Sequence, residues 1–171
     1  PNFGLASKSE KSRKDALTLY KKALLAVRKL NNHLGKEAVL AVHITSSPSN
    51  TMNNVTGSVD RFLESLLEIA SWDWGGARIV IEHCDSYSER FKPQKGFLPL
   101  DGEIDSVSRA NEKTNINVGI TINWARSVIE KRNVLGAVEH ISEVARSGML
   151  SGIMFSGVTD IKDHKYGQWE D

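Results

Sequence analysis

Four short apolar runs, each ending in polar residues, alternate along the chain with longer stretches of helical periodicity. The runs cover residues 38–44, 77–84, 118–124 and 150–156. Their spacing is that of a strand–helix unit with generous loops. The pattern therefore predicts four buried strands separated by helices.

Five helices are predicted from apolar positions that recur every three or four residues. In the first helix this stripe contains Tyr20, Leu24 and Val27, and Gly35 follows as a natural stop. The predicted ranges are 13–34, 58–72, 103–112, 125–131 and 135–147. The residues of the last helix that are expected to face inward are Val138, Ile141, Val144 and Ala145.

Strands that alternate with long helices imply a parallel sheet covered by helices. Two α/β architectures fit this order, a doubly wound open sheet and a (β/α)8 TIM barrel. No glycine-rich phosphate loop follows any of the runs, which weakens the case for a nucleotide-binding sheet. Polar residues gather where each strand ends, and both architectures would place a site there.

Chain length, net charge and cysteine content limit the classes of function that the chain can have. The 171 residues suffice for a single domain, residues 1–171, with a real core. The 22 basic and 21 acidic side chains leave a net charge of +1, which gives no indication of binding to nucleic acid or to a membrane. Cys84 is the single cysteine, so an internal disulfide is excluded and a reduced, cytoplasmic location is expected. No apolar stretch approaches the roughly 20 residues that span a bilayer.

Glu82 is the leading candidate for chemistry. Because side chains alternate across a strand, Glu82 should share a face with Val80, whereas Ile79, Ile81 and His83 should face the helices. A carboxylate is expensive to bury in a parallel sheet. Glu82 is therefore expected to act as a metal ligand or a general acid/base. The alternative is a structural carboxylate that accepts backbone or arginine hydrogen bonds.

The ends of the third and fourth strands supply further candidates. Asn123 and Arg126 leave the third strand together, and the planar arginine fork suits a phosphate or a carboxylate. A surface salt bridge is the alternative role for Arg126. Ser156 shares a face with Met154 at the end of the fourth strand and is assigned to substrate binding.

Three more residues complete the candidate substrate-binding set. His43 lies near the end of the first strand, where it would act as a ligand or a proton carrier. The alternative is a structural histidine. Asp85 follows the second strand and would bind a hydroxyl or cap a turn. Lys95 lies in the long loop that follows, where it would cover an anionic substrate or remain solvated. No role is assigned to His140.

Several of these residues lie in segments that resemble the xylose-isomerase-like TIM barrels. This group includes sugar isomerases and epimerases and DNA repair enzymes of the endonuclease IV type. The segments are residues 4–7, 43–48, 81–85 and 156–158. The chain is also similar to an uncharacterised bacterial family within the group. The marks of that family are Ile81-Glu82-His83-Cys84-Asp85, Lys95-Gly96-Phe97 and Tyr166-Gly167-Gln168-Trp169.

The resemblance implies that the chain forms four central units of a barrel, roughly strands four to seven, within a longer protein. Glu82 would match the strand-five glutamate that binds a divalent metal in the isomerases, so Mn, Mg or Zn is the candidate cofactor. The next strand in those enzymes usually offers Asp and His, where this chain has Asn123 and Arg126. The following strand often offers His, where residues 154–156 are Met-Phe-Ser. The metal set therefore looks incomplete, and Arg126 would supply a fixed positive charge instead.

Three functions follow as expectations. The first is a sugar or sugar-phosphate isomerase or epimerase in which Glu82 exchanges a proton alpha to a carbonyl, while Arg126 and Asn123 hold the enediolate. The second is a degenerate barrel that binds a carbohydrate or polyol without turnover, and the third is a metal-dependent hydrolase of the endonuclease IV-like group. The expected partner is a carbohydrate or sugar phosphate. Four units would also leave sheet edges open to self-association.

Overall fold

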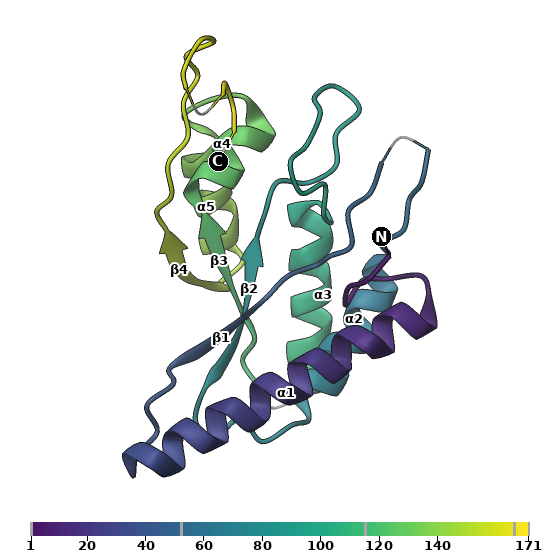
Figure 1. Ribbon diagram of the computed structural model, residues 1–171, viewed down its shortest axis with the longest axis vertical. Helices are drawn as coiled ribbons and strands as arrows, with labels where there is room; N and C mark the ends of the chain where they lie inside the picture. The colour runs from purple at the N-terminus through teal and green to yellow at the C-terminus, as the bar shows by residue number, and fades with distance from the viewer. Residues whose placement is uncertain (1, 52, 115, 166, 171) are drawn as a thin grey trace.

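The computed structural model describes residues 2–51, 53–114, 116–165 and 167–170. Its strands are β1 (Ala41–Ile44), β2 (Arg78–His83), β3 (Gly119–Asn123) and β4 (Leu150–Met154). All neighbouring pairs are parallel, and the strands lie in the order β1-β2-β3-β4 (Figure 1). The predicted parallel α/β sheet is confirmed, and each strand lies inside its predicted run. The described strands form an open sheet with β1 and β4 at its edges.

Within the described residues, five helices accompany the strands and overlap the predicted ranges. They are α1 (Glu10–Leu34), α2 (Val59–Ala70), α3 (Leu100–Lys113), α4 (Trp124–Lys131) and α5 (Gly136–Arg146). α1 begins after Ser9, whose hydroxyl accepts a hydrogen bond from the Ser12 N–H, and ends at Gly35, which has a φ of 63°. In Figure 1 α1 runs obliquely past the lower ends of the strands, whereas α2 and α3 lie alongside one another.

One face of the sheet, here called the outer face, forms the core with the helices. Its side chains are almost fully buried and come from alternate positions of β2 and β3: Ile79, Ile81, Ile120 and Ile122. They cluster with side chains of α2, α3 and α5, among which Phe62, Leu66, Val107 and Val144 are the most buried. The carboxyl ends of the strands are therefore held by a rigid apolar layer.

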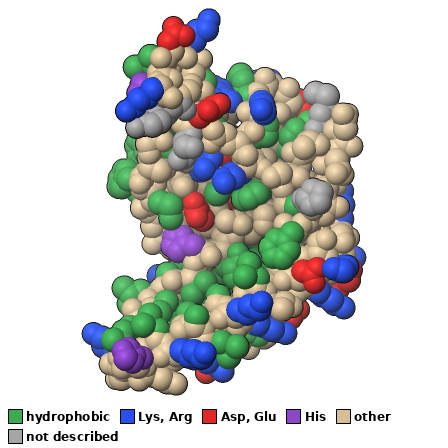
Figure 2. Space-filling view, viewed as in Figure 1, with side chains coloured by type: hydrophobic (Ala, Val, Ile, Leu, Met, Phe, Trp, Pro, Cys, Tyr) green, Lys and Arg blue, Asp and Glu red, His purple; other side chains and the backbone are tan. Residues whose placement is uncertain are grey.

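The opposite face, here called the inner face, carries the polar positions of the same strands. His43 is exposed, Glu82 is half-buried, and Asn123 is only 5% exposed. In the space-filling view, hydrophobic side chains gather along α1 among charged ones, and further charged side chains lie toward the upper end of the molecule (Figure 2). The predicted partition of β2, with Glu82 on one face and His83 on the other, is confirmed.

α5 is rotated relative to its prediction. Val138 is 46% exposed and Ala145 is exposed, so the expectation that they face inward was wrong. Val144 is fully buried and Ile141 packs against the core, as predicted. The buried stripe continues through Ala137 and His140, because α5 packs on α4 as well as on the sheet. Within the described ranges, no helix is long and apolar enough to cross a bilayer.

Candidate functional site

Glu82 is held on the inner face by a hydrogen-bonded series of side chains from neighbouring strands. The Asn123 Nδ2 group donates to Glu82 Oε1 at 2.8 Å. The Ser156 hydroxyl donates to Asn123 Oδ1 at 2.6 Å, and the Arg126 backbone N–H donates to the same oxygen at 3.3 Å. The structure thus brings together three residues that the sequence predicted for one site, and Asn123 fixes the direction of the carboxylate.

Asp85 organises the loop that follows β2. Its carboxylate is fully buried and accepts backbone hydrogen bonds from Gln94 at 2.7 Å and Lys95 at 2.8 Å. The other carboxylate oxygen lies 3.4 Å from Arg126 Nη1, which also donates to Gln94 Oε1 at 2.7 Å. Asp85 therefore closes the turn of the loop and positions the guanidinium at the end of β3.

A basic hollow of about 570 Å³ lies beside this arginine. Its cationic lining consists of Lys92 and Lys95 from the loop, Arg126 from α4, and Arg132 just after α4. Glu170 is the acidic residue in the lining. Even with Asp85 paired to Arg126, the cations outnumber the carboxylates, so the hollow is suitable for an anionic group such as a phosphate.

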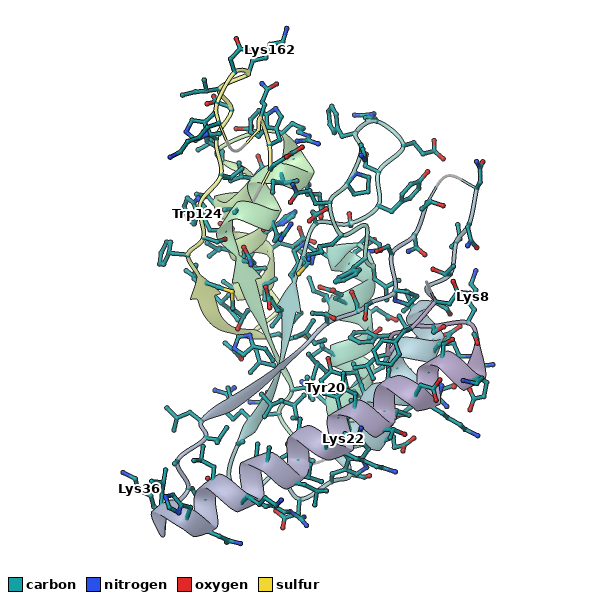
Figure 3. The ribbon with its side chains drawn as sticks, viewed as in Figure 1. Lys8, Tyr20, Lys22, Lys36, Trp124 and Lys162 are labelled. Carbon is teal, nitrogen blue, oxygen red and sulfur yellow. The ribbon has the colours of Figure 1, made fainter. Side chains whose placement is uncertain are left out.

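Two groups from the first part of the chain border the inner face. His43 is exposed and pairs in register with Val80, two residues before the position of Glu82. Tyr20, labelled in Figure 3, lies on the side of α1 that faces the sheet. Burial raises the pKa of the Tyr20 hydroxyl, while hydrogen bonds with Thr45 act in the opposite direction. The tyrosine is therefore a neutral hydrogen-bonding group at this border.

The donor set around Glu82 does not fit a divalent metal. The Asn123 N–H group points at the Glu82 carboxylate, where a metal ion would need a lone pair. The Cys84 sulfur lies 3.8 Å from the same oxygen, but burial raises the pKa of its thiol to about 12, so it is not a thiolate ligand. In the parts of the chain that the structure describes, Glu82 belongs to no group of three ligand-bearing side chains within metal-binding reach.

A second cluster of polar side chains lies on the outer face, beneath the helices. His83 is fully buried, and its Nδ1 atom is 2.8 Å from Glu103 Oε2. Its Nε2 atom is 3.5 Å from Glu130 Oε2, and His140 Nε2 is 3.6 Å from Glu130 Oε1. The two imidazole rings meet edge to face with centroids 4.9 Å apart. β2, α3, α4 and α5 thus each contribute one titratable side chain.

The charges of this outer cluster are tightly coupled. Burial acts to lower the pKa of His83, but the Glu103 and Glu130 carboxylates outweigh it and raise that pKa to about 10. Burial acts to raise the pKa of Glu130, yet its contacts with the two histidines lower it to about 2. Burial and the nearby His83 charge lower the pKa of His140 to about 4. Burial also raises the pKa of Glu103, although contact with His83 opposes this, so the proton is shared between His83 and Glu103, next to an ionised Glu130 and a neutral His140.

The sequence reasoning missed most of this cluster. It placed His83 correctly toward the helices, but it gave His140 no role and did not consider the two glutamates. Helical periodicity contains a usable signal, because Glu103 shares a stripe with Val107 and Ala110 on α3. His140 likewise lies between Ala137 and Val144 on α5. A titratable residue inside an apolar helical stripe indicates a buried polar cluster.

The tail beyond β4 reaches back over the basic hollow. Arg132 Nη1 donates to the Trp169 carbonyl at 3.3 Å, and its guanidinium lies 5.7 Å from the Trp169 ring centroid. Trp169 ends the predicted tail motif, of which Tyr166 lies outside the described residues. The motif is therefore placed, in its described part, against α4 and the loop after β2.

Comparison with known proteins gives a family. The sequence matches the model for "Domain of unknown function (DUF4862)" over residues 1–171. The chain is 37% identical, over 170 residues, to the uncharacterised protein STM3670 of Salmonella typhimurium strain LT2. That match covers 99% of this chain and 51% of the relative, so the chain spans about half the length of the curated relative that it matches. No solved structure matches it. On the strength of the match along its whole length, the chain belongs to the DUF4862 family.

Proposed function

We propose that the inner-face site catalyses proton transfer alpha to the carbonyl of a sugar phosphate or a similar anionic carbohydrate, as an isomerase or epimerase does. The observation that carries this proposal is the position of Glu82. Its carboxylate lies at the end of a buried strand, is oriented by Asn123, and is partly open to solvent. A general base needs this combination of fixed direction and access.

The chemistry requires no redox step. Glu82 takes the proton from the carbon next to the carbonyl, and the electron pair moves into the carbonyl to form an enediolate. Return of the proton from Glu82 to the former carbonyl carbon, while the hydroxyl proton passes to the former carbonyl oxygen, gives the isomer. The epimer requires a proton from an acid on the opposite face of the original carbon. Asn123 is a positioning residue in this scheme, because its amide is already directed at Glu82 and its carbonyl at Ser156.

The basic hollow supports an anionic substrate. Arg126 connects the two parts of the site, since its backbone N–H contacts Asn123 while its side chain lines the hollow. Asp85 holds that side chain from one side and fixes the loop that carries Lys95. A phosphate bound in the hollow would therefore set the register of the sugar carbons relative to Glu82.

Solvent-deuterium exchange tests the proposal directly. The full-length protein is incubated in D2O with pentose and hexose phosphates and the matching free sugars, and incorporation at the alpha carbon is followed by NMR. Wild type is expected to label a phosphorylated sugar, and Glu82→Gln is expected to lower the rate by about 10²- to 10⁴-fold, the usual contribution of a general base. Glu139→Gln, an exposed carboxylate on α5, is the matched control and should exchange like wild type.

Two results would contradict the proposal. If exchange persists in Glu82→Gln, Glu82 is not the base. Exchange that is lost after chelation and returns only when Mn²⁺ is added would also contradict it, because the donor set around Glu82 does not fit a metal ion. Arg126→Gln is expected to weaken the binding of sugar phosphates more than that of free sugars.

A binding protein without turnover is the second candidate, and one observation favours it. The Trp124 and Phe155 rings stack with centroids 5.7 Å apart, and Phe155 is 77% exposed. An exposed phenylalanine beside a partly buried tryptophan is suited to the apolar face of a sugar ring. Saturable sugar binding with no deuterium incorporation in the wild type would establish this candidate instead.

A further inference from the structure

We propose that His83, Glu130 and His140 form a binding site for one divalent metal ion of the zinc class. The site lies on the outer face of the sheet, beneath the helices. It is separate from Glu82, which is on the opposite face of the same strand. Neither its geometry nor its test depends on the activity proposed above.

The spacing of the ligand atoms fits a small ion. The separations are 3.5 Å from His83 Nε2 to Glu130 Oε2 and 3.6 Å from His140 Nε2 to Glu130 Oε1. One atom from each of the three side chains can be chosen so that all lie within 4.8 Å of one another. Tetrahedral zinc with ligands at about 2.0–2.1 Å places them about 3.3–3.4 Å apart. Each histidine–glutamate separation is close to that value, but the two run to different oxygens of Glu130, so coordination through a single oxygen requires a small rotation of the carboxylate or of one ring.

Both imidazoles present the correct nitrogen. His83 Nδ1 is engaged by Glu103 Oε2 at 2.8 Å, and His140 Nδ1 lies 3.0 Å from the Ser127 hydroxyl. Each ring therefore directs its Nε2 atom at Glu130. A histidine ligand whose other nitrogen is fixed by a carboxylate or hydroxyl is the usual arrangement around protein-bound zinc.

A buried nitrogen that makes no hydrogen bond points into the same space. Among the described residues, His83 Nε2 is a buried side-chain nitrogen that makes no hydrogen bond. Its contact with Glu130 Oε2 at 3.5 Å is within ion-pair distance but is too long for a good hydrogen bond, and the residue is fully buried. A metal ion between the two atoms would give this nitrogen a direct bond in place of the long contact.

The ligand types favour zinc over calcium or magnesium. Two imidazoles and one carboxylate suit zinc and other late transition metals, whereas calcium and magnesium prefer oxygen ligands alone. Three protein ligands leave a fourth position for water, and Glu130 is the one ligand whose side chain is partly exposed. An ion here would join β2 to α4 and α5, so its expected effect is on stability.

Metal content and stability test the site. Full-length protein is purified, dialysed against a chelator and titrated with ZnCl2, while metal content, calorimetry and the melting temperature are recorded. Binding at the cluster should saturate and raise the melting temperature. Loading with Co²⁺ should give the visible absorption of a tetrahedral nitrogen–oxygen site.

Three variants locate the ion. His140→Gln should lose one equivalent of bound zinc relative to wild type. Glu103→Gln keeps all three ligands but loses the carboxylate that orients His83, so its zinc affinity should fall by about 10- to 100-fold. His33→Gln removes an exposed histidine at the end of α1 and should bind zinc like wild type.

The outcomes separate a metal site from a purely ionic cluster. No saturable zinc binding in wild type would overturn the proposal, and so would a His140→Gln protein that keeps every equivalent of zinc. If His140→Gln does not fold, the wild-type titration and Glu103→Gln decide the question. An unchanged affinity in Glu103→Gln would then refute the proposal, because Glu103 contacts the ring of His83 directly.

Discussion

Replacing Asp85 with alanine should release the loop of residues 86–97 while the sheet stays folded. The buried carboxylate accepts backbone hydrogen bonds from Gln94 and Lys95 at 2.7 and 2.8 Å. A hydrogen bond to a charged group contributes about 1.5–3 kcal/mol, so the pair contributes about 3–6 kcal/mol to the closed loop. Because the freed N–H groups can reach water when the loop opens, the lower value of about 3 kcal/mol applies.

That value predicts a measurable change in local opening. At about 1.4 kcal/mol for each factor of ten, a loss of about 3 kcal/mol raises the open fraction by roughly 100-fold. Hydrogen–deuterium exchange read by mass spectrometry should show this in peptides from the loop and not in peptides from α2. Glu89→Gln, an exposed carboxylate in the same loop, is the control and should exchange like wild type. Unchanged exchange in the loop of Asp85→Ala would refute the assigned role of the carboxylate.

Three further predictions concern other parts of the molecule. Because burial raises the pKa of Cys84 to about 12, iodoacetamide at pH 8 should label the native protein far more slowly than the unfolded chain; equal rates, read by mass spectrometry, would contradict this. Ile81→Ala should lower the free energy of unfolding by about 2–5 kcal/mol in urea titrations, whereas the 60% exposed Ile161→Ala should change it by less than about 0.5 kcal/mol. Ser156→Ala removes the hydroxyl that holds Asn123, so deuterium exchange into a substrate should slow by about 10-fold while binding is unchanged, and wild-type rates would exclude a positioning role.

The sequence predicted the sheet well because its evidence is local. Alternation along one strand was enough to separate Glu82 from His83, since neighbouring side chains of a strand must face opposite ways. The rotation of α5 was harder, because Val138 and His140 are both on plausible inward stripes and packing against α4 decides between them. Local hydrophobicity favoured Val138, and the structure buried His140.

The two sites differed in how far they could be predicted. Glu82, Asn123 and Ser156 all lie at strand ends, and parallel strands bring their carboxyl ends to one edge, so the meeting of these residues followed from topology. The outer cluster depends on how α3, α4 and α5 are placed over β2. Glu103 and Glu130 contact His83 only once these helices are packed on the sheet. The spacing of residues along the sequence does not encode that packing.

The sequential strand order has a consequence for how the protein is made. Each strand pairs with the one synthesised immediately before it, because the order along the sheet is the order along the chain. Within the described sheet, a growing chain can therefore add β2, β3 and β4 one after another as it leaves the ribosome. Glu82 emerges well before Asn123, so a nascent chain would carry its carboxylate unrestrained until the third unit docks.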